Sequence, residues 1–196
     1  MPSKETLPEG ENKVETLETD IVATPIGDVV VVVAHGVLLA LDFEDCRTRM
    51  MKLLARRFDA VELVLTKNPA GISDRIKQYF AGELTALSGI PMATGGTDFQ
   101  RQVWERLREI SPGSAMTYGD LAQALGNPKA VRAVGMANSL NPISIALPCH
   151  RVVGAGGKLT GYAGGIERKQ WLLLHEGIDL QQGSRGAGEQ LSVFGQ

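Results

Sequence analysis

The chain has 196 residues, of which 43% are hydrophobic, so it can bury one or two cores. Its formal net charge of −2 argues against a protein that binds nucleic acid through a broad cationic surface. Two cysteines are too few for a disulfide framework or a metal cluster, and neither a signal-peptide pattern nor a membrane-length apolar stretch is present, so we expect a cytoplasmic protein without a membrane partner.

The first half of the chain predicts a small α/β unit. Residues 1–18 are polar and rich in glutamate, which indicates a disordered lead-in. The valine-rich residues 29–33 and residues 37–43 predict two strands, joined by a hairpin turn at His35-Gly36. Apolar spacing further predicts a helix over residues 47–58, a strand over 61–65 and a helix over 69–84.

A glycine- and proline-containing connection over residues 85–97 predicts a boundary between two domains. Thr97 is placed to cap a helix over residues 98–110, in which Trp104 belongs to an apolar stripe and is expected in the core. The resulting domain prediction is a lead-in over 1–18, an N-terminal α/β domain over 19–90, a C-terminal domain over 91–180 and a flexible tail over 181–196.

Two short helices are predicted over residues 118–125 and 129–140, separated by the turn residues Gly126-Asn127-Pro128. This order is the helix-turn-helix pattern, although helical hairpins of this kind also occur in proteins that never bind DNA. A last helix is predicted over residues 166–175. We expect the apolar positions of these helices to point inward, among them Leu121, Ala122, Val131, Val134, Trp171, Leu172 and Leu174.

The pentapeptide Pro148-Cys149-His150-Arg151-Val152 is the strongest chemical signal in the chain. A thiol beside potential cations tends to ionise, and the thiolate is the nucleophile. Sequence neighbours on a strand or a helix do not face each other, so His150 needs a turn or a bridging water to take the proton of Cys149. The alternative, a buried and inert cysteine in an apolar strand, remains open at this point.

Charge is segregated along the chain. Residues 115–175 carry six basic side chains against two acidic ones, Asp120 and Glu167. The cationic part therefore coincides with the helix-turn-helix pattern and the cysteine. Nucleic-acid binding with few phosphate contacts and a modest salt dependence is compatible with this distribution.

With these motifs in place, the chain resembles the O6-alkylguanine-DNA alkyltransferases, also called methylated-DNA–protein-cysteine methyltransferases. The resemblance runs from about residue 96 to 178. It is carried by Gly96 to Gln100 with Val103-Trp104, Thr117 to Ala122, Gly126 to Gly135, Asn138 to Pro142, Leu147 to Gly154, Gly161 to Gly165 and Trp171 to Gly177. It implies an α/β (α+β) fold, with a ribonuclease H-like N-terminal sheet domain and a C-terminal helical domain containing a winged helix-turn-helix.

The resemblance also implies an activity, namely repair of DNA by direct reversal. The family flips O6-alkylguanine out of duplex DNA, and by extension O4-alkylthymine, and transfers the alkyl group irreversibly to its own cysteine in a single turnover. The implied partner is double-stranded alkylated DNA, bound at the minor groove by a monomer. No cofactor is implied, and we expect no metal, because His35 and Cys46 are too few ligands for a tetrahedral zinc site.

Residue roles follow from the same resemblance. Cys149 is the implied acceptor, His150 the base that acts through a water, and Glu176 the group that orients His150. Asn141 is the implied hinge between the two halves of the site, and Tyr118 meets a phosphate and helps to protonate the leaving guanine. The implied DNA contacts are Arg132, which enters the base stack, with Tyr118, Ala130, Lys129 and Asn127. The implied substrate pocket consists of Tyr162, Ala163, Gly164, Val152, Met136 and Asn138.

Three other functions compete with this interpretation. A damage sensor of the alkyltransferase-like kind shares the fold but lacks the cysteine, so Cys149 argues against it. A helix-turn-helix transcription regulator with a structural cysteine needs base-reading side chains, and the second helix of the pattern is instead rich in alanine and glycine. A Cys-His hydrolase lacks any motif for a hydrolytic substrate.

Overall fold

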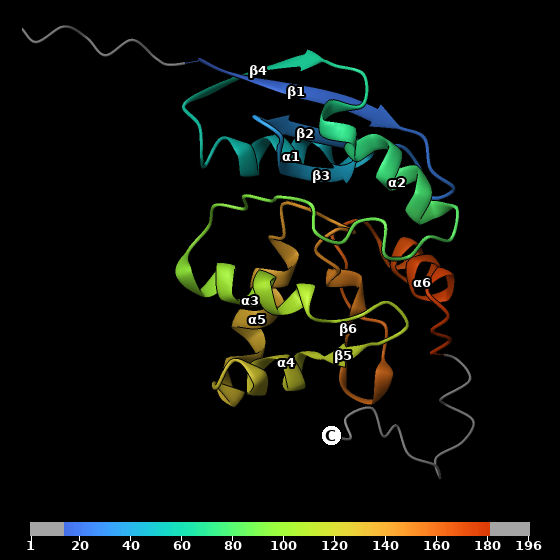
Figure 1. The fold of residues 1–196 in the computed structure, drawn as a ribbon. Coiled ribbons are helices and arrows are strands. Elements are labelled where there is room, and N and C mark those ends of the chain that lie inside the picture. The colour runs from blue at the N-terminus through green and yellow to red at the C-terminus, as the bar shows by residue number, and fades with distance from the viewer. Residues whose placement is uncertain (1–13, 181–196) are drawn as a thin grey trace, which may run out of the picture.

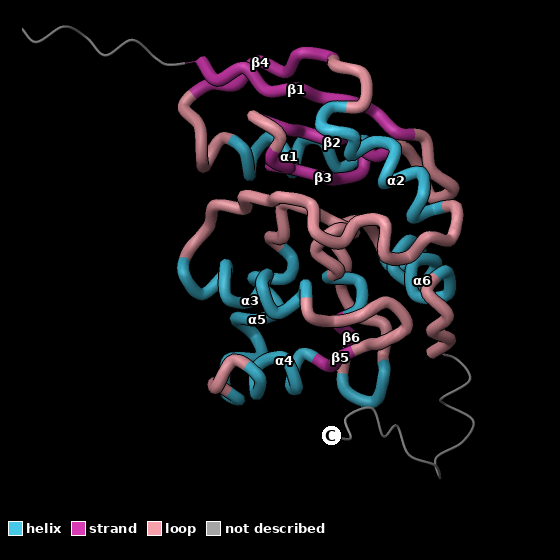
Figure 2. The backbone as a smooth tube through the Cα atoms, viewed as in Figure 1, coloured by secondary structure: helices cyan, strands magenta, loops and turns pink. Residues whose placement is uncertain are grey.

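The computed structural model describes residues 14–180, which form a mixed α/β fold of two stacked halves (Figure 1). A four-stranded sheet with two helices makes the N-terminal half, and helices with a two-stranded sheet make the C-terminal half (Figure 2). The mixed fold class predicted from the sequence is confirmed. The ribonuclease H-like and winged-helix assignments stay predictions, as do the domain boundaries within the described residues.

The N-terminal sheet has the strand order β3-β2-β1-β4, with β2 antiparallel to both neighbours and β4 parallel to β1. All five valines of residues 29–33 are fully buried, because both faces of the sheet are covered. Alternate valines face α1 on one side and α2 with the C-terminal half on the other. The strands are β1 (Val14–Val22), β2 (Val29–Ala34), β3 (Val37–Phe43) and β4 (Ala60–Leu65).

The predicted hairpin turn between β2 and β3 is confirmed. His35 and Gly36 have φ angles of 50° and 79°, the left-handed conformation that a two-residue hairpin requires at both central positions. A histidine tolerates this conformation better than a β-branched residue would. The turn fixes the register that buries the valine run.

The prediction that residues 1–18 form a disordered lead-in is wrong for residues 14–18, which belong to β1. β1 lies inside the sheet, pairs along both edges, and buries Leu17 against α1. Pairing with strands distant in sequence overrides the glutamate-rich composition, which local reasoning cannot anticipate. Residues 1–13 and the predicted tail, residues 181–196, lie outside the described residues.

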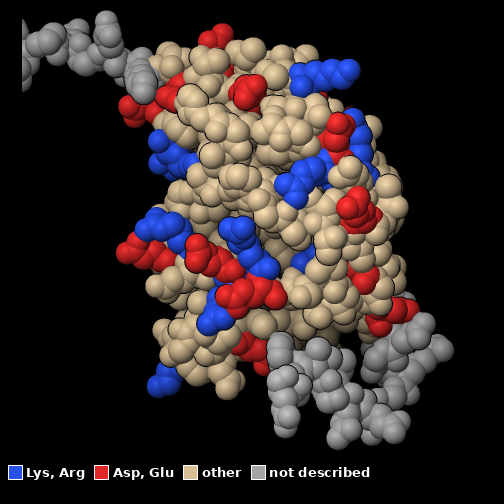
Figure 3. All heavy atoms as spheres, viewed as in Figure 1, with Lys and Arg blue, Asp and Glu red and all other residues tan. Residues whose placement is uncertain are grey.

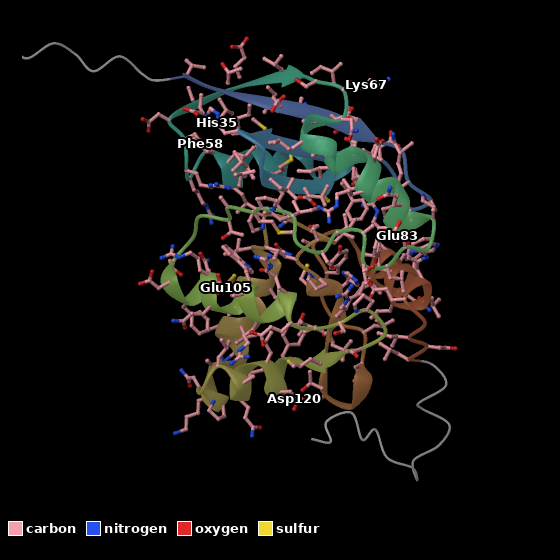
Figure 4. All side chains as sticks on the ribbon, viewed as in Figure 1. His35, Phe58, Lys67, Glu83, Glu105 and Asp120 are labelled. Carbon is pink, nitrogen blue, oxygen red and sulfur yellow. The ribbon has the colours of Figure 1, made fainter. Side chains whose placement is uncertain are left out.

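The N-terminal half contains helices α1 (Arg47–Leu54) and α2 (Ile72–Phe80). Both are shorter than predicted at their C-terminal ends. α2 also begins later than the predicted residue 69, because Asn68, Ala70 and Gly71 have positive φ angles and form a tight turn first. Glu83, labelled in Figure 4, lies just beyond the end of α2.

The C-terminal half begins with helix α3 (Asp98–Arg108), and Thr97 caps it as predicted, within a reciprocal capping box with Gln100. Helix α4 (Tyr118–Ala124) begins with a second capping box between Thr117 and Asp120, which is labelled in Figure 4. Trp104 is buried as predicted, and its indole N–H donates to the Ala137 carbonyl oxygen at 2.9 Å, which joins α3 to α5. The remaining α-helices are α5 (Val131–Ser139), which follows the 3-10 turn η3 (Pro128–Ala130), and α6 (Ile166–His175).

Two predicted core positions are wrong. Val131 is 38% exposed at the start of α5, and Leu174 is 49% exposed, while Leu173 takes the buried position on α6. In short helices the neighbouring elements decide which face is buried. An error of one residue in the position of the apolar stripe rotates the predicted buried face by about 100°. The two-stranded parallel sheet, β5 (Met116–Thr117) with β6 (Val152–Val153), is not predicted, because two residues carry no periodic signal.

The outer edge of β3 connects the two halves. The connecting segment lies along this edge, with Leu38 N donating to the Pro91 carbonyl oxygen at 2.9 Å. Further along the strand, Leu41 N donates to the Pro142 carbonyl oxygen at 3.1 Å, and Ser144 N donates to the Leu41 carbonyl oxygen at 2.7 Å. Covering an edge strand satisfies its free backbone groups. Here it also fixes the segment that leads from α5 to Cys149.

Candidate active site

Cys149 begins a 3-10 turn, η4 (Cys149–Arg151), directly before β6. Cys149 is 3% exposed, and its backbone N–H donates to the Leu147 carbonyl oxygen at 2.7 Å. The interpretation of this segment as one apolar strand is therefore wrong. Adjacent side chains on a strand or a long helix do not face each other, and Cys149 and His150 lie instead in a short 3-10 turn.

Glu176, just after α6, is the centre of a buried hydrogen-bond network. His150 Nε2 lies 3.0 Å from Glu176 Oε1, and Arg151 donates from Nε to Oε2 and from Nη2 to Oε1, each at 2.8 Å. The Tyr79 hydroxyl donates to the same Oε1 at 2.7 Å. The structure thus brings together His150 and Glu176, as the sequence predicted, and adds Arg151 and Tyr79.

The electrostatics of this network define the tautomer of His150. Burial alone would raise the pKa of Glu176, but the hydrogen bonds from His150 and Arg151 lower it to about 2. Burial lowers the pKa of His150, against the opposing effect of Glu176. A neutral imidazole must donate from Nε2 to this ionised carboxylate, which leaves Nδ1 as an acceptor. Nδ1 has no hydrogen-bond partner among the described residues, so its lone pair is free to accept a hydrogen bond.

The thiol of Cys149 is not activated in the way the pentapeptide suggested. Burial raises its pKa, while a hydrogen bond with Asn141 and the charges of Arg49 and Lys169 lower it. Arg151, two residues further along the chain, is paired with Glu176 instead. The buried thiol is therefore a weak acid in this structure, and it needs a neighbouring base to become a thiolate.

Two asparagines hold the backbone around Cys149. Asn141 Nδ2 donates to the Leu147 carbonyl oxygen at 2.8 Å, and Asn141 Oδ1 accepts from Ile143 N at 2.9 Å, which ties the end of α5 to the cysteine segment. Asn138 Nδ2 donates to the Cys149 carbonyl oxygen at 3.3 Å and to the Tyr118 hydroxyl at 3.4 Å. Both residues therefore contact the cysteine segment, while the hinge role of Asn141 and the pocket role of Asn138 stay predictions.

Two further residues at the site were missed by the sequence reasoning. Lys169 of α6 is fully buried, and its ammonium donates to the carbonyl oxygens of Val152 and Thr160 at 2.6 and 2.7 Å. Burial lowers its pKa to about 8. Arg49 of α1 forms an ion pair with buried Asp42 at 2.7 Å and also donates to the Ser139 and Asn141 carbonyl oxygens. The apolar spacing predicted that both residues lie on helices, but no local pattern in the sequence indicated that their side chains are buried.

The predicted pocket residues come from three segments. Val152 is buried beside Cys149, and the loop containing Tyr162, Ala163 and Gly164 packs against the N-terminal half. An added Cβ on Gly164 would lie 2.7 Å from the Phe43 ring, so only glycine fits there. Arg168 holds this loop by donating to the Gly164 carbonyl oxygen at 3.1 Å and by an ion pair with Asp45 at 2.8 Å. Met136, on α5, is 62% exposed and lies at the surface.

Four of the five predicted DNA contacts lie together at the start of α5, whereas the fifth, Tyr118, begins α4 and is half-buried. Asn127, Lys129 and Arg132 are exposed there, and Ala130 is half-buried between them. The cationic surface is smaller than the charge count over residues 115–175 suggested, because Arg151 and Lys169 are buried and Arg168 is paired with Asp45. The face in Figure 3 mixes acidic and basic side chains, and over α3 they pair with each other, as in Arg101 with Asp98.

Within residues 14–180, no group of three or more His, Cys, Asp or Glu side chains is arranged to hold a metal ion. No helix in the same part of the chain is long and apolar enough to span a membrane. The expectations of no metal and no membrane partner remain predictions.

Comparison with known proteins gives consistent matches. Residues 98–178 match the family model described as the DNA-binding domain of 6-O-methylguanine DNA methyltransferase. The methylated-DNA–protein-cysteine methyltransferase of Shigella flexneri is 50% identical over 162 residues, which cover 81% of this chain and 95% of that protein. The protein of the same name from Salmonella typhimurium is 52% identical over 162 residues, with the same coverage.

Solved structures show the same similarity. Mycobacterium tuberculosis OGT in complex with DNA has a TM-score of 0.68 and 40% identity, covering 82% of this chain and 92% of that chain. The O6-methylguanine-DNA methyltransferase of Pyrococcus kodakaraensis has a TM-score of 0.67 and 31% identity, covering 83% of this chain and 99% of that chain. The similarity extends over both halves of the fold.

Proposed function

Because this chain belongs to the family of methylated-DNA–protein-cysteine methyltransferases, we propose that it moves the alkyl group of O6-alkylguanine in duplex DNA irreversibly to its own Cys149. O4-alkylthymine is a second proposed substrate, since its alkyl group is carried on a comparable exocyclic oxygen. The observation that carries this proposal is the position of the buried Cys149 thiol directly before His150, whose ring is fixed by ionised Glu176.

In the proposed reaction, the Cys149 thiol gives its proton to His150 Nδ1 through a bridging water. Sγ then attacks the alkyl carbon, and the bond between that carbon and O6 breaks as the S–C bond forms. The electron pair of the broken bond stays on the guanine. Neutral His150 suits the role of base, because burial keeps its pKa low and Glu176 stabilises the imidazolium that forms. The thioether product has no route back, so each molecule reacts once.

The leaving guanine takes a proton from the Tyr118 hydroxyl, and the proton held by His150 returns to the tyrosine through solvent. Tyr118 begins α4, and its hydroxyl lies 3.4 Å from Asn138 Nδ2, near the cysteine backbone. The backbone N–H groups of Ala163 and Gly164, which donate to no described residue, are proposed to face O6. Val152, Tyr162, Met136 and Asn138 complete the proposed pocket.

The target base must leave the duplex, because the alkyl carbon cannot be attacked while it lies in the stack. We propose that α4 and α5 act as a winged helix-turn-helix, and that α5 enters the minor groove as part of a monomer. The small residues of α5 allow close approach, Arg132 fills the gap left by the base, and Lys129 and Asn127 contact phosphates. The complex of the Mycobacterium tuberculosis relative with DNA supports DNA as the partner.

The test uses a duplex with a single O6-methylguanine, mixed with the purified protein, followed by peptide mass spectrometry. We expect one methyl group on the Cys149 peptide and at most one equivalent per protein. Cys149→Ser should abolish transfer. Cys46→Ser is the matched control and should leave transfer unchanged, because the serine hydroxyl can still donate to the Ala163 carbonyl oxygen, to which the Cys46 thiol donates at 3.7 Å. Lesion binding without methyl gain would favour a damage sensor. The absence of both lesion binding and methyl transfer would contradict the proposal.

A further inference from the structure

Tyr79 reaches the active-site network from the opposite half of the molecule. It lies near the end of α2, is 1% exposed, and donates from its hydroxyl to Glu176 Oε1 at 2.7 Å. The same oxygen faces His150 Nε2 at 3.0 Å. Figure 1 shows α2 and α6 side by side where the two halves meet, and ring contacts between them agree with this view.

The position of Tyr79 is fixed by two kinds of contact with α6. Its carbonyl oxygen lies 2.8 Å from His175 Nε2, and its ring meets the His175 ring edge-on at 5.3 Å between centroids. Phe80, the next residue, packs edge-on against the Tyr79 ring and also against Trp171. The two contacts with His175 hold Tyr79 with its hydroxyl directed toward Glu176.

The carboxylate of Glu176 needs such a fixed donor. Its Oε1 accepts from Tyr79, His150 and Arg151, whereas Oε2 accepts from Arg151 alone. A cavity of about 310 Å³ borders both Tyr79 and Arg151, although Glu176 itself does not line it. The buried carboxylate is oriented by these hydrogen bonds. Because burial raises the pKa of Tyr79, its hydroxyl stays protonated and can only stabilise the ionised carboxylate as a donor.

We propose that Tyr79 is a positioning residue for the alkyl transfer, which holds Glu176 Oε1 toward His150 and so couples the N-terminal half to the reaction. This inference rests on the proposed function only for its kinetic consequence. The chemistry is indirect, since Tyr79 touches neither the substrate nor the thiol. Its contribution is the orientation of the imidazole through the carboxylate, which is the role of the third group in a catalytic triad.

The experiment compares Tyr79→Phe with Phe80→Leu in the full chain. Tyr79→Phe removes one hydroxyl and keeps the ring, while Phe80→Leu disturbs the same aromatic cluster without touching Glu176. Single-turnover rates and lesion affinities are measured separately on O6-methylguanine duplex. We expect Tyr79→Phe to lower the transfer rate by about tenfold, with lesion affinity changed by less than about twofold. Phe80→Leu should change the rate by less than about twofold.

A second measurement follows the histidine rings in the unreacted protein by nitrogen NMR with labelled histidine. The chain has three histidines, so His150 can be assigned with one His150→Gln variant. Tyr79→Phe should shift the His150 ring nitrogens, and Phe80→Leu should leave them in place. Equal rate losses in both variants, a loss of affinity instead of rate, or an unmoved His150 signal would each overturn the proposal. A wild-type protein that transfers no methyl group would contradict the proposed function, while the NMR comparison would still decide the role of Tyr79.

Discussion

Arg151 binds Glu176 through two parallel hydrogen bonds, Nε to Oε2 and Nη2 to Oε1, each 2.8 Å long and both inside the protein. The third nitrogen, Nη1, donates to the Ile110 carbonyl oxygen just after α3. One arginine therefore joins the cysteine turn, the end of α6 and the end of α3. It satisfies a buried carboxylate that would otherwise be costly, while His150 keeps its place on the same group.

The first prediction concerns this ion pair. Arg151→Ala leaves Glu176 buried with too few partners, and we expect the free energy of unfolding to fall by about 3–5 kcal/mol. Arg151→Lys keeps the charge but loses the two-pronged geometry, so its loss should be intermediate. Urea unfolding measures both. Arg106→Ala, which breaks an exposed pair with Glu109, is the control and should cost less than about 1 kcal/mol. A change of similar size in Arg151→Ala and Arg106→Ala would contradict the prediction.

The second prediction is the pH dependence of alkyl transfer. Burial lowers the pKa of His150 below its ordinary value of 6.5, and only the neutral ring can accept the thiol proton. The single-turnover rate should therefore stay level as the pH falls to 6.5 and decline only below it. Rates measured between about pH 5 and about pH 8, with lesion binding followed in parallel, check this. A half-maximal rate above pH 6.5 would show that Glu176 outweighs burial.

The third prediction concerns Lys169. Burial lowers its pKa from 10.5 to about 8, so between these values the unfolded chain binds more protons than the folded protein. Stability contributed by this residue therefore rises with pH across that window. The unfolding free energy of the wild type, minus that of Lys169→Met, should increase by about 3 kcal/mol from pH 8 to pH 10.5. A pH-independent difference would mean that the ammonium is solvated in the folded state.

Lys169 and Tyr79 also show where the sequence stops being informative. A lysine on a predicted helix is usually solvated, and its burial depends on the carbonyl groups of Val152 and Thr160, which only the folded chain brings together. Tyr79 lies 97 residues from its partner Glu176, a separation that no local pattern reveals. Arg151 did carry a signal, since it interrupts an apolar run and a buried arginine requires an acidic partner.

The elements that could be predicted have strong local determinants. Thr97 caps α3 because its side chain accepts from the Gln100 backbone N–H, while the Gln100 side chain accepts from the Thr97 backbone N–H. His35-Gly36 supplies the left-handed conformation that the hairpin needs. The start of β1 and the short pair β5-β6 depend on partners far along the chain, and they were missed. At the site, the family resemblance implied that Glu176 orients His150, and the structure brings the two side chains to 3.0 Å. The pentapeptide gave the wrong pKa direction for Cys149, because burial is a property of the fold.

The fourth prediction concerns the pocket loop. Gly164→Ala would place a Cβ within 2.8 Å of the rings of Phe43 and Tyr162, and we expect a loss of about 1–3 kcal/mol in unfolding free energy. Gly119→Ala is the matched control, because its Cβ would meet only Thr117 at 3.5 Å and it lies inside α4. That change should stabilise the protein by about 0.5–1 kcal/mol. Thermal unfolding of the two variants should therefore move in opposite directions.

The fifth prediction separates phosphate binding from base flipping. Lys129 and Arg132 are both exposed at the start of α5, and neither side chain forms a hydrogen bond or ion pair within the described residues. Lys129→Ala should weaken binding to damaged and undamaged duplexes alike, and lower the slope of log affinity against log salt by about 1. Lys67→Ala is the control, because Lys67 lies far from α5 in the loop before α2 (Figure 4) and should change neither quantity.

Arg132→Ala should act on a different step. If its side chain replaces the flipped base in the stack, the transfer rate falls on duplex DNA but much less on a single strand, where no stack has to be filled. Transfer rates on the same O6-methylguanine sequence in both forms test this, with Lys129→Ala as the comparison. An equal loss on single and double strands would assign Arg132 to phosphate contact, because only a stacking role depends on the complementary strand.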